Sequence, residues 1–392
     1  MPHNACAAGV RSEPEAARPK WPHDTGVRER HVERTRDVRV TLDGTPVLGR
    51  RTGIGRYTAR LAQALAEFPS TRVRLLGLTT RGWRALRTNA PAGTTACGPP
   101  LPARLLRSCW SLAEFPPVEL LCPGADVVHG TNLVQPPAAR AAGVLTVHDL
   151  DFVDAADAAG AGPNPRGFVR SLHRAAVVCT PTRAVAERLT ARFDVDPDRV
   201  VVTPLGVDGA WFHAAPPDAA LRGRYGLPPD YLLFVGQPGP RKGLSTLVQA
   251  LDPDLPPLVL AGPPPTEAPP TGSGPRSTGY LPEEELRRVV AGARALVLPS
   301  RDEGFGLPAL EAMAAGTPVV CSDIPALREV TGGHALLAPY GDSSALRSAL
   351  HRAVSSEGDH GMAAARRHAA EFTWRRCATE TLRAYRLALT SR

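Results

Sequence analysis

The chain has 392 residues, of which 43% are hydrophobic and 21% charged, and its formal net charge at pH 7 is +8. These are globular proportions, with room for two domains that each have a core. No apolar run approaches the roughly 18 residues of a membrane span, and the first residues lack a signal-peptide pattern. We therefore expect a soluble, cytoplasmic protein.

The cysteine spacing argues against two further classes of protein. The seven cysteines, at positions 6, 97, 109, 122, 179, 321 and 377, form no Cys-x-x-Cys pair, and no histidine cluster adjoins them. We therefore expect reduced thiols rather than a disulfide framework or a zinc site. Residues 1–37 combine many charges with little apolar material, which predicts a disordered tail.

Positive charge is concentrated in residues 68–113, which contain no acidic residue but seven arginines, at positions 72, 74, 81, 84, 87, 104 and 107. Sparse aromatic residues and the lack of a reading motif argue against nucleic acid as a partner. A surface that meets anionic lipid or a phosphorylated acceptor fits, and so does an ordinary solvated face. Leu105, Leu106, Cys109 and Trp110 share one side of a short helix there, which fits either membrane docking or a cover helix.

Short apolar runs alternate with helical patterns from residue 38 onward. The first run predicts a strand at 38–42, and apolar residues at helical spacing predict a helix from Gly53 to Phe68. Further strand-like runs follow at 72–78, 126–129, 144–147, 176–180 and 200–203. Such alternation is typical of a parallel sheet covered by helices on both faces.

A second cycle begins after the proline-rich stretch 214–230. It predicts strands at 231–236, 257–261, 276–280, 295–299, 318–321 and 334–338, and helices at 243–251, 282–291, 308–315 and 342–354. The expected fold is α/β, with two sequential doubly wound domains. Ligands of such sheets bind at the carboxyl ends of the strands, so a pair of these domains predicts a cleft between them.

The most informative segment runs from Ser300 to Pro318 and reads Ser-Arg-Asp-Glu-Gly-Phe-Gly-Leu-Pro-Ala-Leu-Glu-Ala-Met-Ala-Ala-Gly-Thr-Pro. It leads from a buried strand through a glycine loop into a helix, with Pro308 in the first turn, where no N–H is required. Such a helix N-terminus is an anion site. Glu303 and Glu311 flank it. This arrangement suits a nucleotide sugar, whose diphosphate carries charge and whose two sugars carry hydroxyls.

In these motifs the chain resembles the retaining glycosyltransferases of family 4 (glycosyl transferases group 1), which have the GT-B fold. The resemblance runs from about Val38 to the last helix. Shorter pieces stand in the family's order: Thr52-Gly-Ile-Gly-Arg-Tyr57, Thr146-Val-His-Asp-Leu150, Pro204-Leu-Gly-Val-Asp208, Val235-Gly-Gln-Pro-Gly-Pro-Arg-Lys-Gly243, Thr278-Gly-Tyr-Leu281 and Phe372-Thr-Trp374.

The resemblance implies two Rossmann-like domains that face a central cleft. The acceptor-side domain would cover 38–213 and the donor-binding domain 214–371. The segment 372–392 would be a C-terminal helix that packs back towards the first domain.

The resemblance also implies roles for single residues. In the first domain, His148 would bond the transferred sugar, and Gly53 and Gly55 would let the backbone approach the donor diphosphate. In the second domain, Arg241 and Lys242 would stabilise the departing nucleoside diphosphate. Arg56 is interpreted as either a site residue or a surface residue.

The two glutamates would act as acceptors, Glu303 for hydroxyls of the transferred sugar and Glu311 for those of the ribose. The rest of the donor site would be formed by Gly236, Leu281, Phe305, Gly306 and Leu307, the last three through backbone N–H groups. Structural interpretations stay open beside these roles. They are a tight turn for the glycines, a carbonyl-bonded ring for His148, solvated loop charge for the basic pair and helix-dipole stabilisation for Glu311.

Two departures from the family pattern matter. Relatives often have Arg directly after the Val-Gly of the donor loop, where this chain has Gln237, so the positive charge must come from Arg241 and Lys242. Thr180-Pro181 stands where relatives often have Val-Ser, which leaves the role of that loop open.

We expect a transferase that moves a hexose from a nucleotide-diphosphate sugar to the hydroxyl of a glycan, a lipid-linked sugar or a small molecule, with retained configuration. The Gly-Pro-Arg-Lys form of the donor loop favours GDP-mannose over UDP-glucose or UDP-N-acetylglucosamine. We find no Asp-x-Asp motif in a suitable strand-end loop and expect turnover without metal or cofactor. A peripheral contact with the inner face of an anionic membrane stays open. So do a nucleotide-sugar epimerase, a sugar phosphorylase and a non-catalytic nucleotide-sugar-binding protein.

Overall fold

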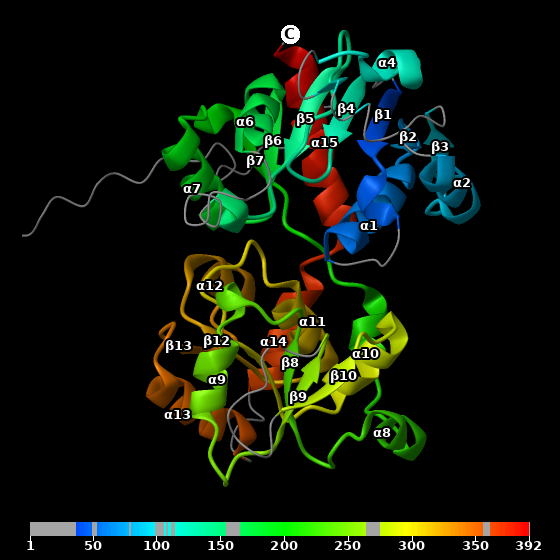
Figure 1. Cartoon of the computed structure of the whole chain (residues 1–392). Helices are drawn as coiled ribbons and strands as arrows, with labels where there is room; N and C mark the ends of the chain where they lie inside the picture. Colours follow the sequence, from blue (N-terminus) through cyan, green and yellow to red (C-terminus); the bar gives the residue numbers. More distant parts are fainter. Residues whose placement is uncertain are drawn as a thin grey trace, which may run out of the picture. The chain divides into compact units, whose positions relative to one another are not determined.

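The computed structural model describes residues 37–48, 53–77, 80–98, 106, 109–110, 114–153, 165–263, 275–355 and 361–391. These residues belong to one compact unit. They form two parallel β-sheets, each covered by helices (Figure 1). The predicted α/β fold of two Rossmann-like sheets is confirmed.

The first sheet has seven strands in the order β3-β2-β1-β4-β5-β6-β7. Each strand pairs in parallel with its neighbours, and most strands are rich in apolar residues, as is usual for sheets buried on both faces. Their bounds are β1 Val38–Asp43, β2 Thr71–Leu76, β3 Thr95–Cys97, β4 Val127–Gly130, β5 Ala142–Thr146, β6 Val177–Thr180 and β7 Val200–Val202.

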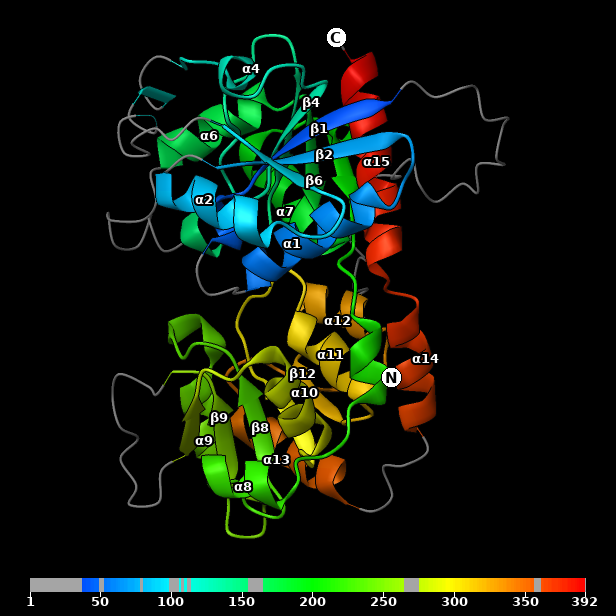
Figure 2. The same ribbon diagram turned by 90° about the vertical axis from the view of Figure 1, so that its right-hand side faces the viewer.

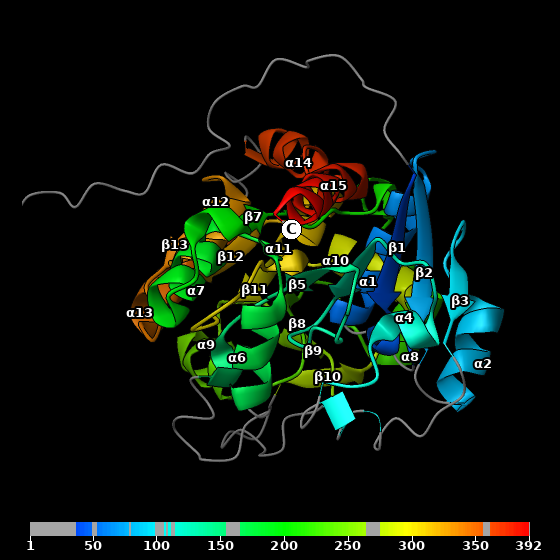
Figure 3. The same cartoon turned by 90° about the horizontal axis from the view of Figure 1, so that it is seen from above.

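Helices cover both faces of this sheet. Viewed from above, α15 lies on one face and α6 on the other (Figure 3). The helix α15 comes from the far end of the chain, and it packs on α1 and on β4 to β7. The helices of this part are α1 Gly53–Ala66, α2 Thr80–Asn89, α4 Val118–Leu121, α6 Pro165–Arg174, α7 Arg183–Phe193 and α15 Trp374–Thr390.

The second sheet has six strands in the order β10-β9-β8-β11-β12-β13. Its strands are β8 Leu232–Val235, β9 Leu258–Ala261, β10 Arg276–Gly279, β11 Ala295–Leu298, β12 Val319–Ser322 and β13 Leu336–Ala338. The accompanying helices are α8 Ala219–Tyr225, α9 Leu244–Ala250, α10 Glu283–Ala291, α11 Leu307–Ala315, α12 Pro325–Thr331, α13 Ser343–Val354 and α14 Met362–Ala370. The helix α14 packs on α11 and leads directly into α15 (Figure 2).

Both sheets reverse their winding direction once. The reversal lies between β1 and β4 in the first sheet and between β8 and β11 in the second. Crevices at such switch points, beyond the carboxyl ends of the strands, are where doubly wound sheets bind ligands. Two loops therefore meet at the switch point of the second sheet. The donor loop, residues 236–243, follows β8, and the glutamate loop, residues 299–306, follows β11.

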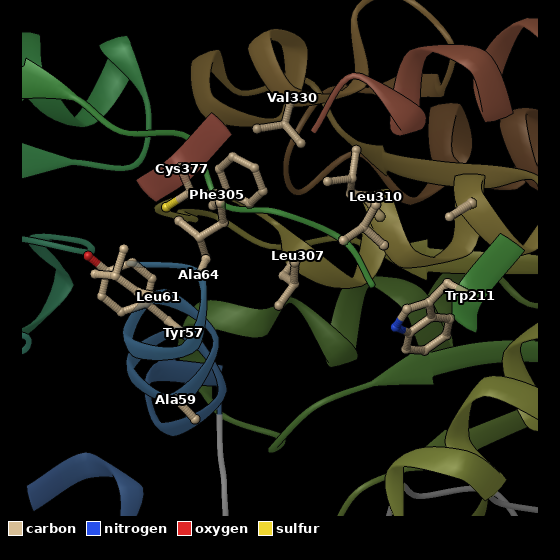
Figure 4. Close-up of a cluster of buried hydrophobic side chains, with 14 of the residues drawn as sticks. Tyr57, Ala59, Leu61, Ala64, Trp211, Phe305, Leu307, Leu310, Val330 and Cys377 are labelled. Atoms are coloured by element: carbon tan, nitrogen blue, oxygen red, sulfur yellow. The ribbon is translucent and has the colours of Figure 1, made fainter. Parts of the chain in front are cut away.

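One hydrophobic cluster joins the two sheets. It contains buried side chains of β1, β2 and α1 together with side chains of β8, α11 and α15. Figure 4 shows part of it, with Tyr57, Leu61 and Ala64 from α1 and Phe305, Leu307 and Leu310 from the segment after β11. The residues on either side of the candidate site thus share one core.

The two chain segments that connect the sheets lie against each other. The N–H of Val207 donates to the carbonyl of Phe372 at 2.9 Å. A Cβ on Gly206 would lie 2.3 Å from the backbone nitrogen of Trp374, so only glycine fits there. The motifs Pro204–Asp208 and Phe372–Trp374 therefore form a single crossing point.

The predicted strands and helices are present with ends displaced by at most two residues. The sequence patterns did not predict the strand β3 or the helices α2, α4, α6, α7, α8, α12 and α14. The proline-rich stretch 214–230, after which the second cycle was expected to begin, contains α8. The predicted tail lies outside the described residues except for Asp37, as do Thr52, Arg104, Leu105 and Arg107.

The expectation of reduced thiols is wrong for one pair. Cys97 and Cys122 form a disulfide that links the end of β3 to the residue after α4, 25 positions apart. These cysteines become neighbours only when the sheet forms, so their spacing gave no signal. Cys109, Cys179, Cys321 and Cys377 are free thiols.

Two described members of the apolar side predicted for 105–110 are buried, whereas the third, Cys109, is exposed. The side chains of Leu106 and Trp110 are buried in a cluster with Leu76 and Val128, and the indole N–H of Trp110 donates to the carbonyl of Pro116. These two residues therefore match the cover-helix interpretation. In the described part of the chain, no helix combines the length and apolar character that crossing a bilayer requires.

Candidate functional site

The loop after β11 carries the predicted anion site. Gly306 has a φ of +81°, and its Cβ position lies 2.4 Å from the Leu327 side chain, so both backbone and packing require glycine. The helix α11 begins at the next residue, with Pro308 in its first turn. Phe305 and Leu307 are buried apolar side chains of the shared core. Only their backbone groups are therefore suited to meet a ligand.

Glu303 lies between the two loops of the second sheet. Its Oε1 is 2.5 Å from Nζ of Lys242 and accepts a hydrogen bond from Oγ of Ser300 at 2.7 Å. The backbone of the donor loop approaches the residue after β11 closely here. A Cβ on Gly243 would lie 2.0 Å from the carbonyl oxygen of Pro299. The structure thus brings Lys242 and Glu303 together as an ion pair at the switch point.

Glu311 is paired with Arg56, which comes from the first turn of α1. The guanidinium Nη1 lies 2.7 Å from Oε1, and Nη2 lies 3.5 Å from Oε2. Only 3% of Glu311 is exposed. Burial raises the pKa of this carboxyl to about 7, against the opposing effect of the Arg56 charge. The surface interpretation of Arg56 is therefore wrong.

His148 follows β5 and is half-buried. Its Nε2 lies 3.0 Å from the carbonyl oxygen of Thr131, and its ring forms a T-shaped pair with that of Tyr57, with centroids 4.6 Å apart. Burial lowers the pKa of His148 to about 4, so the ring is neutral near pH 7. Because its partner is a carbonyl, Nε2 carries the proton and Nδ1 is the acceptor that a sugar hydroxyl can use.

The glutamate loop lies directly against His148. A Cβ on Gly304 would be 1.8 Å from the carbonyl oxygen of His148, and Oγ1 of Thr182 donates to the carbonyl of Gly304 at 2.9 Å. His148 and Glu303 are therefore brought to the same place, although they come from different sheets. The contact with Thr131 is the one expected of a structural strand-end histidine, and it leaves the predicted role of Nδ1 open.

Arg241 contacts carboxylates of the first sheet. Its guanidinium lies 3.4 Å from Asp149 and 3.3 Å from Asp151, and it reaches the carbonyl of Asp302 at 3.5 Å. The two aspartates form an Asp-x-Asp pair directly after β5, so the expectation that no such pair exists in a strand-end loop is wrong. In the structure a guanidinium contacts both carboxylates.

The remaining predicted residues lie around this centre. Gly53 and Gly55 are in the first turn of α1, beside Arg56. Gly236 follows β8 with a φ of +140°. The Leu281 side chain is 5% exposed and belongs to the core, so the backbone is what this turn presents to a ligand.

Sequence reasoning missed a buried polar chain beneath His148. Tyr57 Oη lies 2.9 Å from Oγ1 of Thr146, which lies 2.7 Å from Nε2 of His129, whose Nδ1 lies 2.8 Å from Tyr385 Oη. Burial lowers the pKa of His129 to about 3, so this ring is also neutral. Tyr57 and Tyr385 read as ordinary apolar positions of α1 and α15, and nothing local in the sequence separates them from core residues.

Comparison with known proteins supports these observations. Residues 51–211 match a model of Glycosyltransferase Family 4, and residues 229–356 match a model of Glycosyl transferases group 1. The chain is 30% identical over 309 residues to O-antigen chain mannosyltransferase B of Escherichia coli, covering 72% of this chain and 77% of that protein.

A second relative and two structures add to this. MMP alpha-(1->4)-mannosyltransferase of Mycolicibacterium hassiacum is 33% identical, covering 67% of this chain and 71% of that protein. Sucrose-phosphate synthase from Thermosynechococcus elongatus has a TM-score of 0.68 at 21% identity, over 89% of this chain and 98% of that one. WaaG, a glycosyltransferase involved in lipopolysaccharide biosynthesis, has a TM-score of 0.62 at 16% identity, over 88% of this chain and 98% of that one. The chain belongs to the GT-B glycosyltransferases of family 4 (glycosyl transferases group 1).

Proposed function

We propose that this glycosyltransferase moves a hexose from a nucleoside-diphosphate sugar to an acceptor hydroxyl with retained configuration. The observation that carries the proposal is the pairing of Lys242 with Glu303 beside the first turn of α11. A cation, a buried acceptor and a helix N-terminus at one switch point match a diphosphate joined to a sugar.

Each group has a distinct role in this proposal. Glu303 accepts hydrogen bonds from the transferred hexose, and Nδ1 of His148 accepts one from the same sugar across the site. Lys242 stabilises the negative charge that develops on the departing diphosphate, which is the largest effect asked of a single side chain here. Departure and attack occur on the same face, and the diphosphate assists removal of the acceptor proton.

We favour GDP-mannose as the donor. Two relatives, at 30% and 33% identity, carry mannosyltransferase names, which agrees with the Gly-Pro-Arg-Lys form of the donor loop. A UDP-linked hexose is the competing donor, because the structural neighbour HepE of Anabaena is described in complex with UDP-glucose. The fold likeness alone does not transfer that donor to this chain.

We propose turnover without divalent metal. The Asp-x-Asp pair after β5 is where a metal would be sought, and the guanidinium of Arg241 contacts both of its carboxylates. A cation supplied by the chain is thus in contact with both carboxylates. The acceptor is a glycan, a lipid-linked sugar or a small molecule. A contact with anionic membrane, if the acceptor is lipid-linked, would use exposed arginines such as Arg84 and Arg87 rather than Leu106 and Trp110.

The test is a turnover assay with GDP-mannose, UDP-glucose and UDP-N-acetylglucosamine against a panel of acceptors, with and without a chelator. We expect released nucleoside diphosphate and an α-linked product from one donor, unchanged by the chelator, and no product from Glu303→Gln. Interconversion of free donors without acceptor would indicate an epimerase, and a requirement for inorganic phosphate a phosphorylase. Donor binding without any turnover would indicate a non-catalytic binding protein.

A further inference from the structure

The two acidic residues of the site are each paired with one cation, in closely similar ways. Lys242 lies 2.5 Å from Glu303, and Arg56 lies 2.7 Å from Glu311. Both glutamates are buried, whereas the Lys242 and Arg56 side chains keep 19% and 20% of their surface exposed. The carboxylates of Glu303 and Glu311 are thus the more deeply buried partners, and the cations are the more exposed ones.

Arg56 is bound to a residue of α11, at a position from which a side chain leans towards the first turn of that helix. Glu311 is the fifth residue of that helix, and side chains on a helix lean towards its N-terminus. The carboxylate and the guanidinium bound to it are therefore displaced towards the N–H groups at the start of α11. That helix end attracts anions.

We propose that Arg56 is a phosphate-binding residue for the nucleoside diphosphate, delivered from the first sheet. This inference rests on the proposed function. The donor brings hydroxyls that replace the cations at Glu303 and Glu311, and it brings a diphosphate that receives those same cations. Lys242 and Arg56 each exchange a carboxylate for a phosphate oxygen.

Charge balance favours this double exchange. Breaking a buried ion pair is costly when it leaves a charge without a partner. Here both carboxylates gain hydroxyl donors and both cations gain phosphate oxygens, so no buried charge loses its partner. Arginine suits the task because its planar fork can bind phosphate bidentately. Arg241 is a weaker candidate, because it contacts Asp149, Asp151 and a carbonyl, none of which the donor's hydroxyls would engage.

The chain offers a matched control in Arg60, one helical turn further along α1. Its Nη2 lies 2.7 Å from Asp208 and 3.5 Å from Glu283. Arg60 thus also joins α1 to carboxylates beyond the first sheet, but it does not contact Glu303 or Glu311. Loss of its charge has the same effect on net charge as loss of Arg56.

The experiment measures dissociation constants by calorimetry for guanosine, GMP and GDP and for uridine, UMP and UDP. The proteins are the wild type, Arg56→Gln, Arg56→Lys and Arg60→Gln. A charge-assisted hydrogen bond contributes about 1.5–3 kcal/mol, which is roughly a 10- to 100-fold change in affinity. We expect Arg56→Gln to lose about that factor for the diphosphate, while the nucleoside binds equally well or better because Glu311 is released.

The ratio of diphosphate affinity to nucleoside affinity decides the question. It should fall in Arg56→Gln, lie between in Arg56→Lys and stay at the wild-type value in Arg60→Gln. An unchanged ratio in Arg56→Gln would overturn the inference, as would equal gains for all three ligands, which would show that Arg56 only blocks Glu311. Arg56→Lys retains a positive charge beside Glu311 and provides the comparison if Arg56→Gln does not fold. Failure of the wild type to bind either series would instead overturn the proposed function.

Discussion

The two sheets share one winding pattern but hold different chemistry at the ends of their strands. The second sheet presents charge: Lys242 and Glu303 pair within two loops that follow neighbouring strands. The first sheet adds neutral groups to its charged Asp149 and Asp151, because burial lowers the pKa of His148 to about 4 and that of His129 to about 3. The difference indicates a division of labour around the sugar, where the second sheet contributes the carboxylate of Glu303 and the first sheet contributes the neutral ring of His148.

The largest expected effect is on kcat, and it shows whether Arg241 and Lys242, the two neighbouring cations of the donor loop, act alike. Lys242→Gln should lower kcat by about 10²- to 10³-fold, the loss typical of one group that stabilises developing charge. Arg241→Gln should lower it less, because the Arg241 guanidinium contacts the aspartates after β5. Steady-state assays of both variants measure the difference. Equal losses in kcat would show that both cations act on the diphosphate.

The second prediction concerns how the buried carboxyl of Glu311 makes the free energy of unfolding depend on pH. A carboxyl whose pKa is raised from 4.5 to about 7 by burial stabilises the folded protein most at low pH. That contribution is lost as pH rises from about 4.5 through about 7, by at most about 3 kcal/mol. The free energy of unfolding of the wild type, relative to Glu311→Gln, should therefore be higher at pH 5 than at pH 7.5. Urea unfolding at both values measures it, and a constant difference would contradict the raised pKa.

The smallest effect concerns the crossing point between the sheets. Gly206→Ala places a Cβ 2.3 Å from the backbone nitrogen of Trp374, and such overpacking costs about 1–3 kcal/mol. We expect a melting temperature several degrees lower, measured by circular dichroism. Gly209→Ala is the control, because its Cβ would meet no atom within 4 Å. If both variants melt alike, the close approach of the two segments is not required.

The sequence could predict those parts of the structure that depend on a local pattern of residues. Strands such as Leu232–Val235 are unbroken apolar runs, so the sheets could be predicted from local pattern. Glu303, Gly306 and Glu311 stand in one short segment, so their shared loop and helix could be predicted too. The strand Thr95–Cys97 has no such run, and it was missed.

Contacts between distant residues could not be predicted in this way. Arg56 and Glu311 are 255 positions apart, and His129 and Tyr385 are 256 apart. Nothing near either residue indicates the partner, because the contact exists only once α1, α11 and α15 are packed. The Asp149–Asp151 pair was readable in the sequence, but its contact with Arg241 depends on the approach of a loop from the other sheet.

The position of α15 has a consequence for synthesis of the chain on the ribosome. The first sheet is complete in sequence once β7 has emerged, yet one of its faces is covered by α15, which is translated only after the whole second sheet. Until Tyr385 arrives, the nascent sheet exposes an apolar face, and Nδ1 of His129 lacks the hydroxyl that satisfies it. Translation of the whole second half must therefore precede the final folding of the first.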